Sequence, residues 1–545
     1  MLQKMVARRV GVSPLRGLED FFIHILRKCD KTVDLKRIHA QMEKFTLLQS
    51  NFLVTRMLDI CDQNGEIDYA TLLFQKIYEP NIFSYNAMIR AYAHGRKYAY
   101  TVNVYNDMLR HHLHVEEQIF PDRFTYPFVI RSCGGLVDVC LGKQVHGHVC
   151  KFGLMGNNMI ENSLLDMYVK CDEVTEAHKV FDEMTERDVI SWNSLISGYM
   201  KVGQIRKAKS LFEDLPNKTI ISWTTMISGY TKIGDFGDAL DIFRRMQVDR
   251  MQPDWISLVA VLPACAQLGA LELGRWIHFF ADKKGFLKRT SVCNALIEMY
   301  MKCGSLSQAL QVFDKMPERD VISWSTMIAG LAHHGKAHEA IELFHDMRKA
   351  KVDPNEITFV GLLSACGHAG LLDDGLEYFE SMQNVYSIEP GIEHYGCLVD
   401  LLGRTGNIDR ALKLVKSMKI KPDSAIWGSL LSSCRTYRNI ETAVIAMENL
   451  VELEPEDTGN LILFANIYAD LGKWDEVSSM RKFIRSRSMK KTPGCSLIEV
   501  DSVVQEFISG DDSKPFCNDI FRILDILAMH QIKISEQVEI EPENL

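Results

Sequence analysis

Val189-Ile-Ser-Trp-Asn-Ser-Leu-Ile-Ser-Gly-Tyr199 is repeated with few changes from Ile220 to Tyr230, and again from Val321 to Leu331. The copies start at residues 189, 220 and 321, which are offsets of 31 and 101 residues. The larger offset divides into three further units of similar length. A period of this size is typical of stacked helix-turn-helix units, each of which buries its apolar face only against its neighbours. The sequence therefore predicts a repetitive chain without one central core.

Each predicted unit contains two helices. In the unit that begins at Val189, apolar residues recur three and four positions apart, as on one face of a helix, and Gly203 separates two such segments. The apolar positions are Leu195, Ile196 and Tyr199 in the first segment and Ala208, Leu211 and Phe212 in the second. Short turns close the units, so we expect antiparallel helix pairs and an all-α solenoid.

The overall charge argues against indiscriminate binding to nucleic acid. The chain has 545 residues, 47% of them hydrophobic, with a net charge of −9 and a pI near 6.0. Non-specific binders carry a broad field of Lys and Arg that displaces counterions. A binder that selects particular sequences remains compatible with this composition.

The cysteines favour packing in a reducing compartment. Fourteen are present and no two form a C-x-x-C motif. Cys171 and Cys303 occupy the same place in equivalent units, as small apolar core residues would. A metal or disulfide role is the alternative.

The amino-terminal segment 1–18 differs from the rest of the chain. It contains Lys4, Arg8, Arg9 and Arg16, and no acidic residue precedes Glu19. This composition predicts an organellar transit peptide, with a disordered basic tail as the alternative.

The most apolar run, from Trp255 to Leu271, is in phase with the repeat and contains Pro263 and Gln267. We therefore interpret it as a buried repeat helix, and we expect no membrane association.

Three kinds of unit alternate along the chain. A short kind carries Met-Tyr-x-Lys-Cys and ends in Glu-Arg-Asp, a second carries the Ile-Ser-Trp phrase, and a longer third carries Leu-Gly-Lys/Arg followed by an apolar residue and His. The recurrent histidines of the third kind are His39, His146 and His278. Because a solenoid holds equivalent positions far apart, we interpret them as packing or capping groups and not as a ligand cluster.

This alternation resembles the plant pentatricopeptide repeat proteins that combine standard (P), long (L) and short (S) motifs. The resemblance covers residues 19–423 in about twelve units and implies a right-handed superhelical solenoid. The units are L 19–50, S 51–81, P 82–122, L 123–157, S 158–188, P 189–219, P-like 220–254, L 255–289, S 290–320, P 321–355, L 356–391 and S 392–423. The unit 82–122 departs from the pattern by an insertion near residues 112–120.

The segments after the repeats resemble the extension motifs that define the E subclass. The first motif spans 424–457 and the second 458–491. The remaining segment, 492–545, begins with an alternating pattern that predicts a short β-hairpin, and we expect it to be a truncated post-extension segment and tail without a deaminase domain. The family role of this subclass is cytidine-to-uridine editing of organellar RNA.

The expected chemistry is binding and not catalysis. A nucleobase deaminase needs H-x-E and then P-C-x-x-C to hold zinc and shuttle a proton. The chain has one H-x-E, His114-Val-Glu116, and no C-x-x-C. We expect no enzymatic activity, no metal and no cofactor, so a cytidine deaminase-bearing protein would act in trans.

The resemblance implies that the fifth and last residues of a unit select one RNA base. The predicted pairs are Thr55 with Asn81, Asn86 with Asp122, Asn162 with Asp188, Asn193 with Thr219, Thr224 with Asp254, Asn294 with Asp320, and Ser325 with Asn355. In family terms the Asn–Asp pairs resemble the combination that prefers uridine, and Thr–Asp resembles the combination that prefers guanosine. Thr–Asn and Ser–Asn resemble the combination that prefers adenosine. Asn–Thr suggests only a preference for a pyrimidine. The alternative is that these polar residues only cap helices.

A second recurrence lies eight residues after the fifth position, where Lys170, Lys201, Lys232 and Lys302 are found. We predict that these lysines contact phosphates, with a solvated helix face as the alternative.

Together these features predict a single-stranded RNA adaptor. It would specify a cytidine for editing in a mitochondrial transcript, or alternatively a plastid one, and recruit the deaminase and other editing subunits through residues 424–510. In the family register the pairs read A-U-N-U-Y-G-N-U-A from −14 to −6 relative to the edited cytidine. The alternative is a tetratricopeptide-like protein-binding scaffold without RNA specificity.

Overall fold

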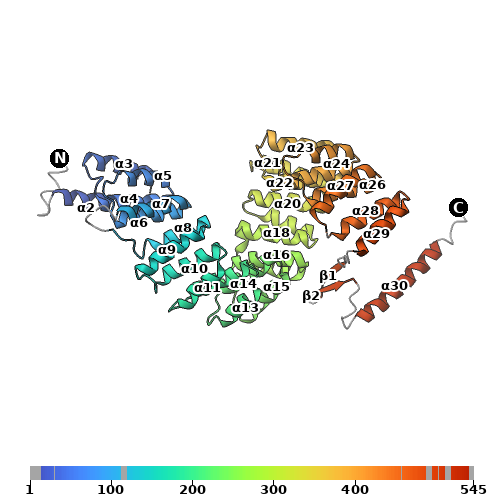
Figure 1. The fold of residues 1–545 in the computed structure, drawn as a ribbon, viewed down its shortest axis with the longest axis horizontal. Helices are drawn as coiled ribbons and strands as arrows, with labels where there is room; N and C mark the ends of the chain where they lie inside the picture. Colours follow the sequence, from blue (N-terminus) through green and yellow to red (C-terminus); the bar gives the residue numbers. More distant parts are fainter. Residues whose placement is uncertain are drawn as a thin grey trace. The chain divides into compact units, whose positions relative to one another are not determined.

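The computed structural model describes residues 14–29, 31–111, 119–455, 457–486, 494–500, 503–509 and 517–538. The chain divides into two units, Met1–Gln252 and Pro253–Leu545. Each unit is a succession of antiparallel helix pairs (Figure 1).

In the first unit the helices are α2 (Pro14–Leu26), α3 (Thr32–Lys44), α4 (Asn51–Asn64), α5 (Ile67–Gln75), α6 (Ile82–His94), α7 (Tyr98–His111), α8 (Tyr126–Leu136), α9 (Val139–Lys151), α10 (Asn158–Lys170), α11 (Val174–Glu183), α12 (Val189–Lys201), α13 (Ile205–Asp214), α14 (Ile220–Ile233) and α15 (Phe236–Val248).

In the second unit they are α16 (Trp255–Leu268), α17 (Leu271–Lys283), the 3₁₀ turn η1 (Phe286–Lys288), α18 (Thr290–Lys302), α19 (Leu306–Lys315), α20 (Val321–His333), α21 (Ala337–Lys349), α22 (Glu356–Ala369), α23 (Leu372–Asn384), α24 (Ile392–Arg404), α25 (Ile408–Ser417), α26 (Ser424–Thr436), α27 (Ile440–Leu453), α28 (Thr458–Asp470), α29 (Trp474–Ser486) and α30 (Cys517–Val538). The expected all-α repeat architecture is confirmed.

The Ile-Ser-Trp phrase recurs because its tryptophan joins consecutive helix pairs. The Phe181 ring meets the Trp192 ring edge-on with centroids 4.8 Å apart, and Phe313 meets Trp324 in the same way at 5.1 Å. In both cases the phenylalanine lies on the second helix of one pair and the tryptophan on the first helix of the next. Such edge contacts stabilise by about 0.5–1.5 kcal/mol beyond area burial.

The Glu-Arg-Asp ending of the short units also has a structural reason. Arg319 lies over the Phe313 ring, with its guanidinium carbon 4.5 Å from the centroid, and donates from Nε to the Phe313 carbonyl at 3.0 Å. Arg187 does the same over Phe181, at 4.7 Å and 2.9 Å. The arginine therefore adds a side-chain donor to a carbonyl at the end of the second helix, which also accepts from the backbone N–H of the C-cap residue.

The recurrent histidines pack as expected. His146 Nδ1 lies 2.9 Å from the Tyr168 hydroxyl, and His278 Nδ1 lies 2.9 Å from the Tyr300 hydroxyl. Burial lowers the pKa of both imidazoles. His39 forms the corresponding bond to Tyr69 at 2.7 Å. Neutral histidines of this kind link one helix pair to the next.

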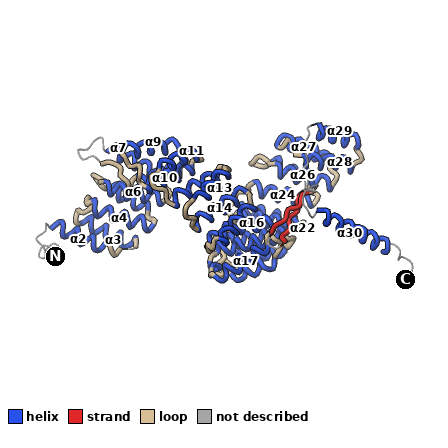
Figure 2. The backbone as a smooth tube through the Cα atoms, turned by 90° about the horizontal axis from the view of Figure 1, so that it is seen from below, coloured by secondary structure: helices blue, strands red, loops and turns tan. Residues whose placement is uncertain are grey.

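The predicted hairpin is confirmed by strands β1 (Cys495–Val500) and β2 (Val503–Ile508), which pair antiparallel with Leu497 opposite Glu506. Figure 2 shows the two strands in red against the helices. Glu499 Oε2 accepts a hydrogen bond from the backbone N–H of Glu272 at 3.0 Å, near the start of α17. The N-cap residue of that helix is Ala270, which has no side chain able to cap it.

The structure differs from two boundaries expected from the sequence, and one expected feature lies mostly outside the described residues. Helix α2 begins at Pro14 and buries Leu18, so it includes the last residues of the segment 1–18 assigned to a transit peptide. Helix α8 begins at Tyr126, three residues after the expected start of its unit. Most of the expected insertion, with His114-Val-Glu116, lies outside the described residues.

Among the described residues, no helix is both long and apolar enough to cross a membrane. The same residues contain no group of three or more His, Cys, Asp or Glu side chains placed to hold a metal ion.

Candidate nucleic-acid interface

The last residue of most units caps the first helix of the next unit. Asp188 Oδ1 accepts from the Ser191 N–H at 2.8 Å, and Asp320 Oδ1 accepts from the Ser323 N–H at 2.9 Å. The other last residues whose side chains cap the next helix are Asn81, Asn157, Thr219, Asp254, Asn355 and Asp423. The capping interpretation of these residues is therefore correct, whether or not they also meet a base.

Asp122 departs from this pattern. Its Oδ1 accepts from the N–H groups of Phe124 at 2.9 Å and Thr125 at 3.1 Å, in the turn that precedes α8. Pro127 in the first turn of α8 is compatible with this later helix start, because a proline needs no hydrogen-bond acceptor there.

Four of the predicted pairs are in direct hydrogen-bond contact. Each joins the fifth residue of a unit to its last residue, and in the three Asn–Asp pairs the amide nitrogen donates to the carboxylate. The distances are 3.0 Å for Asn86–Asp122, 3.0 Å for Asn162–Asp188, 3.1 Å for Asn294–Asp320 and 3.1 Å for Ser325 Oγ–Asn355 Oδ1. In Asp188 the capping oxygen is Oδ1 and the Asn162 amide uses Oδ2, so one carboxylate serves both roles.

The carboxylate also fixes which way the amide points. An ionised carboxylate only accepts, so the nitrogen of the asparagine must face it. Burial alone would raise the pKa of Asp320, but hydrogen bonds from Ser323 and Asn294 outweigh it and lower the pKa. Asp320 therefore stays ionised at neutral pH and holds Asn294 with its oxygen turned away.

Three fifth-position asparagines, two of them held by a carboxylate, have an amide oxygen without a partner. Oδ1 of Asn162, Asn193 and Asn294 is buried and makes no hydrogen bond. A buried acceptor without a donor costs about 1–3 kcal/mol, so a ligand N–H that reached it would recover that loss. Because these oxygens are shielded in the free chain, such a ligand would have to displace neighbouring side chains slightly.

The pair Asn86–Asp122 differs from the other two Asn–Asp pairs because its amide oxygen has a donor. Thr125 Oγ1 donates to Asn86 Oδ1 at 2.6 Å, which supplies the donor that Asn162 and Asn294 lack. The sequence pattern, which placed the three pairs in one group, could not show this contact.

Of the other three pairs, Thr55–Asn81 and Asn193–Thr219 are not in direct hydrogen-bond contact within the described structure. Thr55 and Asn81 are joined through Ser84, whose Oγ lies 2.9 Å from Thr55 Oγ1 and donates to Asn81 Oδ1 at 3.1 Å. Asn193 and Thr219 share no hydrogen bond. The seventh pair, Thr224 with Asp254, is divided between the two units of the chain.

An exposed apolar residue precedes the fifth position by three places in most units. The sequence prediction did not include this recurrence, although its signal is readable: an apolar residue at the second position falls outside the buried face. These residues are Phe52, Phe83, Phe124, Met159, Ile190, Ile221, Ile256, Ile322 and Ile357. Residues three apart are neighbours on a helix, so the stripe runs beside the fifth-position side chains.

The four lysines lie on exposed positions, and three are paired with acids. Lys170 Nζ lies 2.6 Å from Asp166, Lys201 Nζ 2.7 Å from Asp172, and Lys302 Nζ 2.9 Å from Glu298. Lys232 has no ion pair within the described part of the chain. Exposed pairs stabilise by about 0–1 kcal/mol, so a phosphate could replace each carboxylate at little cost. Phosphate contact by these lysines stays a prediction.

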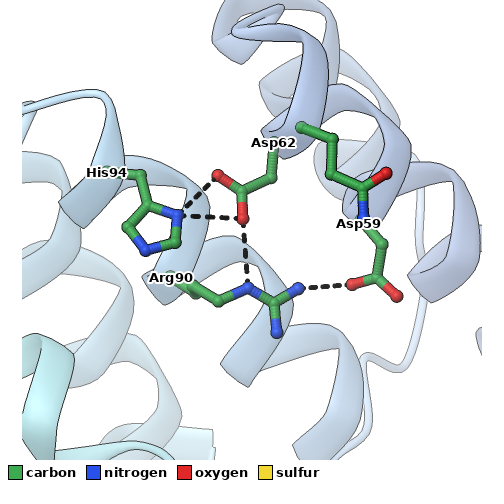
Figure 3. A pocket seen from close by; sticks show the side chains of 5 residues that line it. Asp59, Asp62, Arg90 and His94 are labelled. Carbon is green, nitrogen blue, oxygen red and sulfur yellow. Dashed lines mark hydrogen bonds and ion pairs between the residues drawn. The ribbon is translucent and has the colours of Figure 1, made fainter. Parts of the chain in front are cut away.

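His94 occupies the lysine position of the unit that begins at Ile82. Its Nδ1 lies 2.9 Å from Asp62 Oδ1, while Arg90 bridges Asp59 and Asp62 from the same helix (Figure 3). These groups line an open cavity of about 380 Å³. The arginine already neutralises carboxylates there, so this stretch offers less free positive charge than the lysine positions do.

Comparison with known sequences agrees with the repeat pattern. The profile described as "PPR repeat" matches residues 83–113, 162–189, 190–220, 291–321, 357–385 and 393–421, and the "PPR repeat family" profile matches 218–267 and 319–368. The "E motif" profile matches 437–499, across the expected boundary between the two extension motifs.

Relatives match over most of the chain. The pentatricopeptide repeat-containing protein At2g20540 of Arabidopsis thaliana is 59% identical over 517 residues, 95% of this chain and 96% of the relative. A relative printed as "Putative pentatricopeptide repeat-containing protein At5g59200, chloroplastic" is 42% identical over 92% of this chain and 90% of its own length. One named mitochondrial, At2g03880, is 38% identical over 85% and 67%. All three are from Arabidopsis thaliana.

The fold has a counterpart among solved structures. The crystal structure of the pentatricopeptide repeat protein PPR10 from maize matches with a TM-score of 0.52 and 16% identity, covering 89% of this chain and 75% of that chain. The chain belongs to the pentatricopeptide repeat family, and its E motif agrees with the expected E subclass.

Proposed function

We propose that this protein binds single-stranded RNA and reads individual bases with the fifth and last residues of its units. The observation that carries the proposal is the Asn–Asp arrangement of Asn162 and Asn294, in which a helix-capping carboxylate holds the amide and leaves its oxygen without a donor. Uracil suits this arrangement because its N3–H is a donor, whereas the corresponding nitrogen of cytosine is an acceptor.

The exposed apolar stripe supports the same proposal. A side chain such as Ile190 or Ile322, more than half exposed, offers a face on which a base can pack. Base packing on aromatic side chains is tolerant of sequence and stabilises by about 1–3 kcal/mol per base, and aliphatic faces give a smaller gain of the same kind. Packing would supply affinity, and the polar pair beside it would supply selectivity.

We further propose that the bound RNA is an organellar transcript in which a cytidine is converted to uridine by a deaminase recruited in trans. The E motif after the repeats supports recruitment, and the relatives named chloroplastic and mitochondrial support an organelle. Of the two organelles we propose the mitochondrion, and the basic composition of segment 1–18 is typical of an organellar transit peptide.

Binding to synthetic RNAs tests the first proposal. An RNA that carries A-U-N-U-Y-G-N-U-A should bind more tightly than one in which the uridines opposite Asn162 and Asn294 are cytidines. Equal affinity for all sequences, or no RNA binding, would favour a protein-binding scaffold. Sequencing organellar transcripts of a knockout tests the second proposal, since one lost editing event should lie downstream of that sequence.

A further inference from the structure

An open cavity lies between α26 and α28, the first helices of the two extension pairs. It has a volume of about 480 Å³, which is within the range of small-ligand sites. Its lining consists of Ser432, Arg435, Thr436, Arg438, Leu463 and Asp470. Two of these side chains are cationic and one is acidic, so the lining is positive in a chain whose net charge is −9.

The polar side chains of this cavity have donors to spare. Arg435 Nε donates to Asp470 Oδ2 at 3.1 Å, and both side chains remain nearly half exposed. Arg438 is exposed and makes no ion pair within the described part of the chain. The hydroxyls of Ser432 and Thr436 make no hydrogen bond to any described residue. An anion that entered would therefore meet two guanidinium groups, only one of which is engaged by an acid.

The turn after α26 holds Arg438 in place. The backbone of Arg438 has a φ of 55°, and the N–H of the next residue, Asn439, donates to the Cys434 carbonyl at 3.0 Å. The Tyr437 hydroxyl donates to the Arg404 carbonyl at 2.6 Å, which ties the same turn to the preceding helix pair. Because the turn is already ordered, binding through Arg438 costs little backbone entropy.

No repeat unit has this pair of arginines. Arg435 and Arg438 are the twelfth and fifteenth residues of the first extension segment, and none of the repeat units has arginine at both places. The fifth residues of the two extension segments are Gly428 and Ile462, which offer no polar side chain to a base edge. The cavity therefore differs in chemistry from the predicted base-selecting positions.

The predicted phosphate position argues for a protein ligand at this cavity. Eight residues after the fifth position, where four repeat units have lysine, the extension segments have Thr436 and Asp470. A carboxylate repels phosphate, so the row of predicted phosphate contacts does not continue through these helices. Exposed aromatic side chains follow both helices instead: Tyr437, directly after α26, is 46% exposed and Trp474, at the start of α29, is 66% exposed. Tyrosine, tryptophan and arginine are enriched at protein interfaces.

We propose that the cavity between α26 and α28 binds a carboxylate from an acidic segment of a partner protein, through Arg435 and Arg438. This inference rests on the proposed recruitment of a partner by the extension segments, and it names the chemistry that selects that partner. A planar guanidinium binds a carboxylate in bidentate fashion, and hydrogen bonds between charged groups are about twice as strong as neutral ones. An apolar residue next to the acid would pack against Leu463 of the same lining.

Fluorescence anisotropy with labelled peptides tests this site in the full-length protein. The probes are short peptides in which Asp-Asp or Glu-Glu stands before Leu or Phe, and matched peptides in which Asn-Asn or Gln-Gln replaces the acids. The test variant is Arg435→Gln with Arg438→Gln. The control is Arg481→Gln with Arg485→Gln, which removes the same charge from exposed arginines of α29 outside the cavity. Circular dichroism verifies that both variants are folded.

The wild type should bind its best acidic peptide at least about 10-fold more tightly than the matched amide peptide, because the amide forms no charge-assisted hydrogen bonds with the arginines. The test variant should bind the two peptides equally, whereas the control should keep the wild-type preference. The RNA affinity of both variants should stay within about 2-fold of the wild type, with an unchanged slope of log K against log salt.

Equal binding of acidic and amide peptides by the wild type, or loss of the preference in the control as well, would overturn the site. Weaker RNA binding by the test variant, with a salt slope shallower by about 1.4, would overturn it in favour of an RNA phosphate site. Selective RNA binding without a peptide preference would reject the cavity and leave the proposed RNA binding intact. A peptide preference without base-dependent RNA binding would support the cavity and reject the proposed RNA binding.

Discussion

Asn294 Nδ2 donates to Asp320 Oδ1 at 3.1 Å, and the same oxygen accepts from the backbone N–H of Ser323 at 2.9 Å. The carboxylate that orients the fifth residue of one unit thus also caps the first helix of the next unit. Helix capping and the proposed base selection therefore depend on the same residue, and a mutation can separate them.

Replacement of Asp320 by Ser should keep the cap and lose the orientation of Asn294. Serine is as good an N-cap as aspartate, so the free energy of unfolding should change by less than about 0.5 kcal/mol, whereas Asp320→Ala should lower it by about 1 kcal/mol. Both variants should lose the preference for uridine over cytidine opposite this unit. Urea unfolding and anisotropy with the two RNAs measure the two effects, and retention of the uridine preference in Asp320→Ser would contradict the role assigned to the carboxylate.

The helical repeat could be predicted from the sequence because its determinants are local. First helices begin at Val189, Ile220 and Val321, where the repeated phrase also begins, because a capping residue precedes each of them. The apolar spacing within a unit in the same way determines which face is buried. The assignment of segments 424–457 and 458–491 to separate motifs remains a prediction.

The interface was less predictable because it depends on packing between units. The sequence shows that Ile190 and Ile322 fall outside the apolar face of their helices, but how far they are exposed depends on the neighbouring helices. The bond from Thr125 to Asn86 joins residues 39 positions apart through a turn that the repeat pattern does not describe. Equivalent positions in sequence therefore have unequal hydrogen-bonding partners in the structure.

Low pH should destabilise the repeat array through the half-buried histidines His146 and His278. Burial lowers the pKa of His146 and His278 from the ordinary value of 6.5, so the folded state binds fewer protons than the unfolded state just below that pH. Stability should therefore be complete above about pH 6.5 and fall as the pH is lowered through the window between the unfolded and folded pKa values. Urea midpoints at pH 7.5 and 5.5 measure the loss, and His278→Gln should reduce it. A pH-independent difference between this variant and the wild type would contradict the assignment.

Removal of the acidic side chain beside a lysine should strengthen RNA binding if the lysine contacts a phosphate. Glu298→Gln frees Lys302 from its ion pair, so affinity should rise about 2- to 5-fold at low salt. Lys302→Gln should weaken binding and reduce the salt slope by about 0.7. An unchanged slope in the lysine variant would place Lys302 on a solvated face, the alternative that the sequence left open.

The pair Thr224 with Asp254 predicts that one substitution changes the selected base. Asp254 Oδ1 accepts from the Ser257 N–H at 2.8 Å, the same capping geometry as in Asp320. In family terms Thr224→Asn gives this pair the Asn–Asp combination, so the preference should shift from guanosine toward uridine. A difference of about 1–3 kcal/mol is the scale expected for one mismatched base. Anisotropy with RNAs that carry G or U at −9 measures it, and an unchanged preference would refute the pairing of these residues.

Recruitment should depend on an exposed aromatic residue of the extension helices. Trp474 at the start of α29 is 66% exposed, and large exposed aromatic residues often carry much of the binding energy of protein interfaces. Trp474→Ala is preferable to truncation after Asp423, because Leu398 and Leu402 of the last repeat share one apolar core with Trp427 and Leu461 of the extension helices. Truncation would expose that core and confuse loss of recruitment with loss of folding.

We expect Trp474→Ala to leave RNA affinity unchanged and to reduce editing in a complemented knockout. Phe279→Ala, equally exposed on α17, should affect neither. Full editing by the Trp474 variant would show that recruitment uses another surface.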